Sequence, residues 1–106
     1  MPKYLFEVQY NVEGLRGLKS QGGTARVEAS RALIEELGGH LESFHFAFGH
    51  NDAYLIAELP SNVASAAVDL IAGTSGFVST RTTVLLTPED LDEAAKAQAT
   101  YRPPGA

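Results

Sequence analysis

Two runs of alternating apolar and polar residues near the middle of the chain predict a pair of β-strands. Residues 40–48 carry phenylalanine at three alternate positions, and residues 53–59 alternate in the same way, as expected of strands with one buried face. Turn-forming residues, Gly49 to Asp52, separate the runs, so the strands are expected to form an antiparallel hairpin. The alternation places four residues opposite the phenylalanines: Leu41, Ser43, His45 and Ala47.

Two further strands are predicted near the two ends of the chain. Residues 3–10 alternate, and residues 77–86 are rich in threonine and valine, whose branched side chains pack well in sheets. An aromatic stripe results, which is expected either to form core or to line a pocket between sheet and helices: Tyr4, Phe6, Tyr10 and Phe48.

Two long helices are predicted between these strands. Residues 25–37 follow Thr24 as a capping residue and end at a pair of glycines, and a second helix follows Ser61 and runs to about Ser75. Both segments carry apolar residues at helical spacing, which indicates one buried side in each helix.

Two shorter helical segments complete the pattern. Residues 12–19 follow a capping Asn11 but contain two glycines, which predicts a short, lid-like insert. Thr87 and Pro88 begin an alanine-rich helix that runs to about Ala99 and is expected to dock on the rest of the domain.

The predicted order is strand, helix, strand, strand, helix, strand, followed by a C-terminal helix. This βαββαβ order indicates a ferredoxin-like α+β fold, in which an antiparallel sheet carries both helices on one face. Residues 1–100 are expected to form a single domain, and residues 101–106 a flexible tail.

The second face of the sheet carries more apolar residues than a face in water would carry, among them Leu5, Leu41 and either Leu55 or Ile56. A second sheet is expected to cover it, giving a dimeric α+β barrel. A chain of 106 residues has a modest core, so that association would bury useful additional surface. We therefore expect a homodimer or a higher homo-oligomer.

Composition narrows the possible functions. The formal net charge of -5 argues against general nucleic-acid binding, and no apolar run is long enough for a membrane span. The sequence contains no cysteine, so disulfides and thiolate chemistry are excluded. The chain begins directly with a strand pattern instead of a signal peptide, and a cytoplasmic location is expected.

His45 is the first candidate for acid–base chemistry, because an imidazole on a largely apolar strand requires a partner. It could act as a general base, with Glu7 or Gln9 orienting its other nitrogen and with Tyr10 or Asp52 assisting. The alternative is a structural histidine at a subunit interface.

The turn between the two central strands is the second candidate. Gly49, His50 and Asp52 could bind a small ligand, with His50 as acid or base, although the same residue types serve as ordinary turn formers. Glu7 and Arg81 lie within strand patterns; Arg81 could hold a ligand carboxylate, or the two could pair across the sheet or an interface. The histidine spacing predicts no metal site.

Several segments together resemble the GYD-domain family of small bacterial proteins: KYLFEVQY, GGTAR, FAFG followed by Asp52, LP-N-A, and TTVLLTPE. The resemblance extends from Lys3 to about Ala95. It implies a ferredoxin-like domain of the dimeric α+β barrel superfamily, a superfamily that includes cofactor-independent oxygenases and isomerases. The namesake motif has tyrosine before its aspartate, whereas this chain has Asn51 before Asp52.

Three functions follow from this pattern. The leading hypothesis is a homo-oligomeric, cofactor-free binding or regulatory module for a small apolar or weakly acidic molecule. The first alternative, implied by the resemblance, is a cofactor-independent oxygenase or isomerase with His45 as general base. The second alternative is a structural assembly subunit with a filled interior and no cavity.

Overall fold

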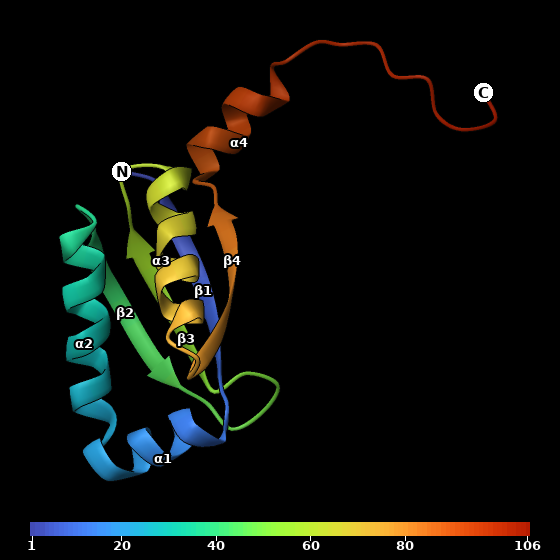
Figure 1. The fold of residues 1–106 in the computed structure, drawn as a ribbon. Coiled ribbons are helices and arrows are strands. Elements are labelled where there is room, and N and C mark those ends of the chain that lie inside the picture. Colours follow the sequence, from blue (N-terminus) through green and yellow to red (C-terminus); the bar gives the residue numbers. More distant parts are fainter.

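A four-stranded antiparallel sheet forms the centre of the computed structural model, which describes residues 1–106 (Figure 1). The strand order across the sheet is β2-β3-β1-β4. The strands are β1 (Lys3–Tyr10), β2 (His40–Phe46), β3 (Ala53–Glu58) and β4 (Val78–Leu85). The β1 strand lies between β3 and β4 and is antiparallel to both, which confirms the predicted ferredoxin-like α+β arrangement.

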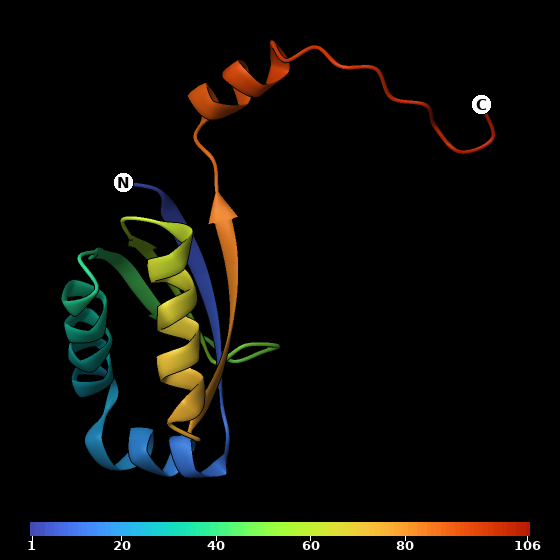
Figure 2. The same cartoon turned by 45° about the horizontal axis from the view of Figure 1, so that its top comes forward.

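Two long helices, α2 (Gly23–Glu36) and α3 (Asn62–Thr74), cover the same face of this sheet (Figure 1). A third helix, α1 (Val12–Gln21), crosses one end of the layered body and joins β1 to α2 (Figure 2). The opposite face of the sheet has no helix over it, and we call it the open face. No helix in the structure combines the length and the apolar character needed to cross a bilayer.

The hydrophobic core lies between the sheet and the two long helices. Alternate residues of β1 and β3 point into it, as the period-two pattern predicts, and Ile34 of α2 and Val68 of α3 face them. The buried strand residues and the residue after β3 are Tyr4, Phe6, Val8, Leu41, Ala53, Leu55, Ala57 and Leu59.

The predicted facing of Leu41 is wrong. Leu41 lies on the helix-covered face and is only 3% exposed, whereas the alternation predicted it beside His45 on the opposite face. The pairing of β2 with β3 shifts register between Leu41 and Ser43, so that Glu42 is an extra residue in β2. A bulge of this kind inverts the alternation on one side of itself, and no apolar signal in the sequence marks it.

Several predicted element ends also differ from the observed ones; the largest difference is in the last helix, which was predicted to about Ala99 and ends at Ala95. Gly22, with φ of 85°, is the residue before α2, which therefore begins ahead of the predicted cap Thr24. The β2 strand ends at Phe46, and Phe48 is fully exposed in the following loop rather than facing a pocket. The α1 helix begins at the predicted cap, where Asn11 accepts a hydrogen bond from the Gly14 amide, but it continues to Gln21, two residues beyond the predicted end.

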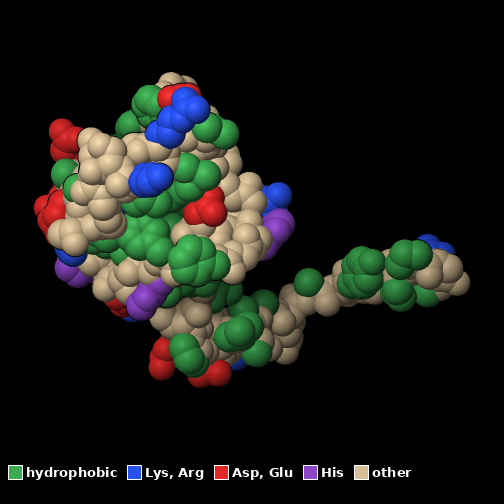
Figure 3. Space-filling model, turned by 90° about the horizontal axis from the view of Figure 1, so that it is seen from below, with side chains coloured by type: hydrophobic (Ala, Val, Ile, Leu, Met, Phe, Trp, Pro, Cys, Tyr) green, Lys and Arg blue, Asp and Glu red, His purple; other side chains and the backbone are tan.

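The last helix, α4 (Pro88–Ala95), does not dock on its own chain, contrary to the prediction. Thr87 and Asp90 form the expected capping box, but every residue of α4 is exposed. The helix and the tail project from the body (Figures 2 and 3). The radius of gyration is 17.0 Å, against roughly 13 Å for a compact chain of this length. The Leu91 side chain remains 58% exposed, and α4 has no buried residue.

Candidate functional site

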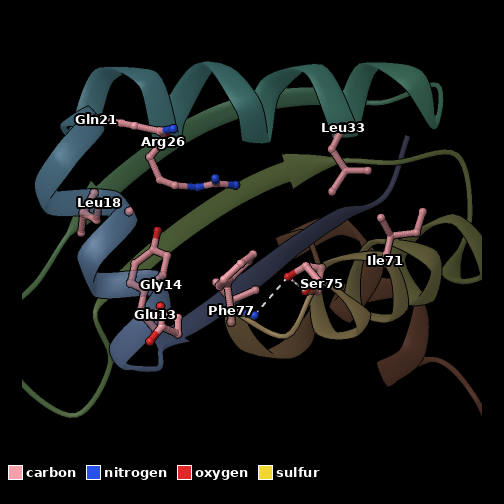
Figure 4. Close-up of a pocket in the computed structure, with 13 residues that line it drawn as sticks. Glu13, Gly14, Leu18, Gln21, Arg26, Leu33, Ile71, Ser75 and Phe77 are labelled. Carbon is pink, nitrogen blue, oxygen red and sulfur yellow. Dashed lines mark hydrogen bonds between the residues drawn. The ribbon is translucent and has the colours of Figure 1, made fainter.

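A cavity of about 530 Å³ lies beside α1, between α2, the end of α3 and the adjoining ends of β1 and β4 (Figure 4). This volume is within the range of small-molecule sites, which is roughly 300–1,000 Å³. Thirteen residues line it: Tyr10, Glu13, Gly14, Gly17, Leu18, Gln21, Arg26, Leu33, Ile71, Ala72, Ser75, Phe77 and Val78. They come from elements that are far apart in sequence, so the cavity exists only in the folded chain.

The α1 helix is held against the turn between α3 and β4. The Asn11 backbone amide donates to the Phe77 carbonyl at 3.1 Å, and the Asn11 side chain donates to the Gly76 carbonyl. A Cβ atom at Gly14 would overlap the Phe77 carbonyl oxygen, so the close approach of α1 requires glycine at this position. No residue of α1 is fully buried, which makes this helix a thin wall over the cavity.

Tyr10 is the predicted site residue that reaches this cavity. It is partly buried at the end of β1, and its backbone amide donates to the Asp52 carboxylate at 2.8 Å. Burial raises the pKa of the Tyr10 phenol, the nearby Arg26 guanidinium opposes that increase, and the negative charge of Asp52 adds to it. The phenol therefore stays protonated at neutral pH and can donate a hydrogen bond.

We expect Tyr10 to ionise at a higher pH than an ordinary tyrosine when tyrosinate absorbance is followed. The unfolded phenol ionises near pH ~10. Its contribution to stability is therefore complete below that pH and is lost as the pH rises through the higher folded value. The part of the tyrosinate absorbance that appears at the higher pH should disappear in Tyr10→Phe. It should persist in the control variant Tyr101→Phe, because Tyr101 is an exposed residue of the tail. Persistence of this absorbance in Tyr10→Phe would contradict the assignment.

The open face of the sheet carries the other predicted charged residues. Strand register aligns His45, Tyr54, Glu7 and Arg81 in one row across β2, β3, β1 and β4. None of the ion pairs in the structure includes Glu7 or Arg81. This row is separated from Tyr10 by the sheet itself, because Tyr10 shares the helix-covered face with Val8. His45 and Tyr10 therefore do not face a common site within one chain.

The loop between β2 and β3 contains the remaining predicted residues. Gly49 and His50 are exposed, and the His50 carbonyl accepts a hydrogen bond from the Gln9 side chain at 2.8 Å. Asp52 anchors the loop, because its backbone amide donates to the Val8 carbonyl and its carboxylate accepts from Tyr10. These contacts are those of a structural turn that is fixed to the end of β1.

Asn51 is the buried residue of this loop, with 4% of its surface exposed. Its side-chain amide donates to the Tyr54 hydroxyl at 3.2 Å, so that it lies against the open face beside the row defined above. A buried amide requires such a partner, and the contact fixes the orientation of the Tyr54 phenol.

Sequence reasoning missed most of the cavity. The glycines of residues 12–19 indicated a lid-like insert, but nothing in the sequence indicated that Arg26 and Leu33 of α2 would face it. An arginine in the first turns of an amphipathic helix is ordinarily a solvent-facing residue.

The topology and the cavity define a ferredoxin-like α+β protein with a candidate small-molecule site between its sheet and its helices. A family model described as the GYD domain matches residues 4–95. The chain therefore belongs to the GYD domain family. A comparison with curated proteins gave no match.

Proposed function

We propose that the protein is a homo-oligomeric, cofactor-free binding or regulatory module that encloses a small apolar or weakly acidic molecule. The cavity of about 530 Å³ under α1 is the observation that carries this proposal. Its wall combines apolar side chains such as Leu33 and Ile71 with a few polar groups, which is the usual composition of ligand sites.

Two unpartnered surfaces support association of identical chains. The open face carries partly buried apolar residues, Leu5, Ile56 and Leu85, within a frame of charged residues. Leu86 and Leu91, before and within α4, are 64% and 58% exposed. A second copy that covers the sheet and contacts α4 would bury both sets of residues.

The two alternative functions receive less support. A structural assembly subunit would have a filled interior, and the cavity argues against that. An oxygenase or isomerase that uses His45 as general base would need assisting groups on the open face, where Tyr10 does not lie. The groups of this chain that face the same side as His45 are Tyr54, Glu7 and Arg81 of the row described above.

Native mass spectrometry beside a denatured spectrum tests the proposal. We expect an oligomer that carries an extra non-covalent mass, and we expect Gly17→Leu to lose that mass. Gly17 lines the cavity, and a Cβ atom there meets no heavy atom within 4 Å, so a leucine side chain can begin at this position without overlap and extend into the cavity space.

Gly73→Leu is the matched control. Gly73 also lies in a helix, and a Cβ atom there would also meet no heavy atom within 4 Å, but Gly73 does not line the cavity. Its variant should retain the bound mass. Retention of the mass in Gly17→Leu would place the ligand elsewhere, and a monomeric wild-type protein would contradict the oligomer.

A further inference from the structure

Five of the eight basic residues belong to no ion pair, and Arg26 is the only one of these five that is partly buried rather than exposed. Lys3, Arg16 and Arg31 pair with Glu42, Glu13 and Glu28 respectively. Arg26 belongs to no ion pair, although it is partly buried and extends from α2 into the cavity (Figure 4). A partly desolvated guanidinium without a carboxylate partner attracts an anion, because no group of opposite charge offsets its own.

Tyr10 provides a second donor in the same region of the cavity. Its phenol is close enough to Arg26 for the guanidinium to influence its ionisation. The carboxylate of Glu13 is the competing charge, but it accepts a hydrogen bond from Arg16 at 2.8 Å and is well exposed to solvent. The charge that faces the interior of the cavity is therefore positive.

Apart from Gln21, which is exposed at the end of α1, the large side chains of the rest of the wall are apolar. Leu33 of α2 and Ile71 of α3 lie on opposite sides of the space, and Phe77 lies beside it, just before β4 (Figure 4). Val78, the first residue of β4, also lines the space. Ser75 provides no free group, because its hydroxyl donates to the Ala72 carbonyl and accepts from the Phe77 amide. The apolar side chains of this wall suit a hydrocarbon or aromatic body.

We infer that the ligand is a small organic acid, whose carboxylate lies between the Arg26 guanidinium and the Tyr10 hydroxyl and whose apolar body lies against Leu33, Ile71 and Val78. This inference rests on the proposed function, since it names the class of molecule that the same cavity binds. Arg26 is the specificity-determining residue, and Tyr10 adds a neutral hydrogen bond to the same head group.

Isothermal titration with 3-phenylpropanoate and 3-phenylpropan-1-ol tests this inference, because the two probes share a body and differ in charge. We expect the acid to bind at least about 10-fold more tightly, as one charge-assisted interaction would give. Arg26→Met should remove this preference and leave the affinity for the alcohol unchanged. Tyr10→Phe, which keeps the ring, should weaken the acid alone by about 5-fold.

Arg31→Met is the matched control, because Arg31 lies on the same helix but pairs with Glu28 and does not line the cavity. Equal binding of both probes, abolished for both by Gly17→Leu, would overturn the acid inference and leave the proposed function intact. Absence of binding by both probes, or binding that Gly17→Leu does not affect, would overturn the inference together with the proposed site.

Discussion

Replacing Gly39 by alanine is expected to lower the free energy of unfolding by about 3 kcal/mol, near the upper end for overpacking of a core. A Cβ atom at this position would overlap the Glu58 carbonyl oxygen. It would also lie 2.7 Å from Cδ2 of Leu59 and 3.0 Å from Cγ2 of Ile34. Leu59 and Ile34 are fully buried, so neither can move into solvent. The methyl group must therefore separate the beginning of β2 from the end of β3.

Denaturant unfolding at a fixed protein concentration measures this effect, and Gly73→Ala provides the control. Gly73 has open space on α3, and alanine there should stabilise the protein by about 0.5–1 kcal/mol through helix propensity. The two glycine replacements are thus expected to have opposite signs. A neutral Gly39→Ala variant would show that the beginning of β2 yields more easily than the close packing indicates.

The β1 and β3 strands were predictable because burial alternates along them with a period of two, whereas β4 was predicted from its threonine and valine content. Tyr4, Phe6 and Val8 all point under the helices, as the pattern in residues 3–10 requires. The same argument failed at Leu41, because a bulge changes the facing of a residue without changing the composition of the strand. The local pattern therefore predicted the positions of the strands well. It predicted less well which face of the sheet each side chain would lie on.

The candidate site was less predictable, for a different physical reason. Tyr10 was a candidate because it continues an aromatic stripe, but the residue that most clearly sets the charge of the cavity is Arg26, 16 positions later on a helix. The two residues meet because α1 returns the chain across the end of the sheet, with Gly22 at positive φ before α2. The residue patterns within β1 and α2 do not predict this path of the chain, so they do not predict that Tyr10 and Arg26 lie close together.

The cavity and the open face, on which the proposed function depends, lie on opposite sides of one sheet. The helix-covered side holds the cavity with Tyr10, and the open face holds the row with His45 and Arg81. Because the strands are shared, a second copy on the open face would support β1 from the side opposite the cavity. Because each strand side chain points to only one face of the sheet, a substitution can change ligand binding or the association of chains without changing the other.

Ile56→Lys is accordingly expected to weaken association by more than about 100-fold, because an unpaired charge in a buried interface costs several kcal/mol. Ile56 lies near the middle of the open face, opposite Leu5 on β1 and Ser43 on β2. In a separate chain the lysine should be tolerated, because Glu58 follows two residues later on the same face of β3. The effect should therefore appear in the oligomeric state and not in the fold.

Sedimentation or light scattering against the chain mass of 11.3 kDa would measure the change. Ala32→Lys is the control, since it adds the same charge at an exposed position of α2 on the helix-covered side. We expect that variant to remain oligomeric and Ile56→Lys to become monomeric with unchanged circular dichroism. If both variants keep the wild-type mass, the open face is not the interface. The apolar residues of α4, Leu91 foremost, would then be the surface through which the chains associate.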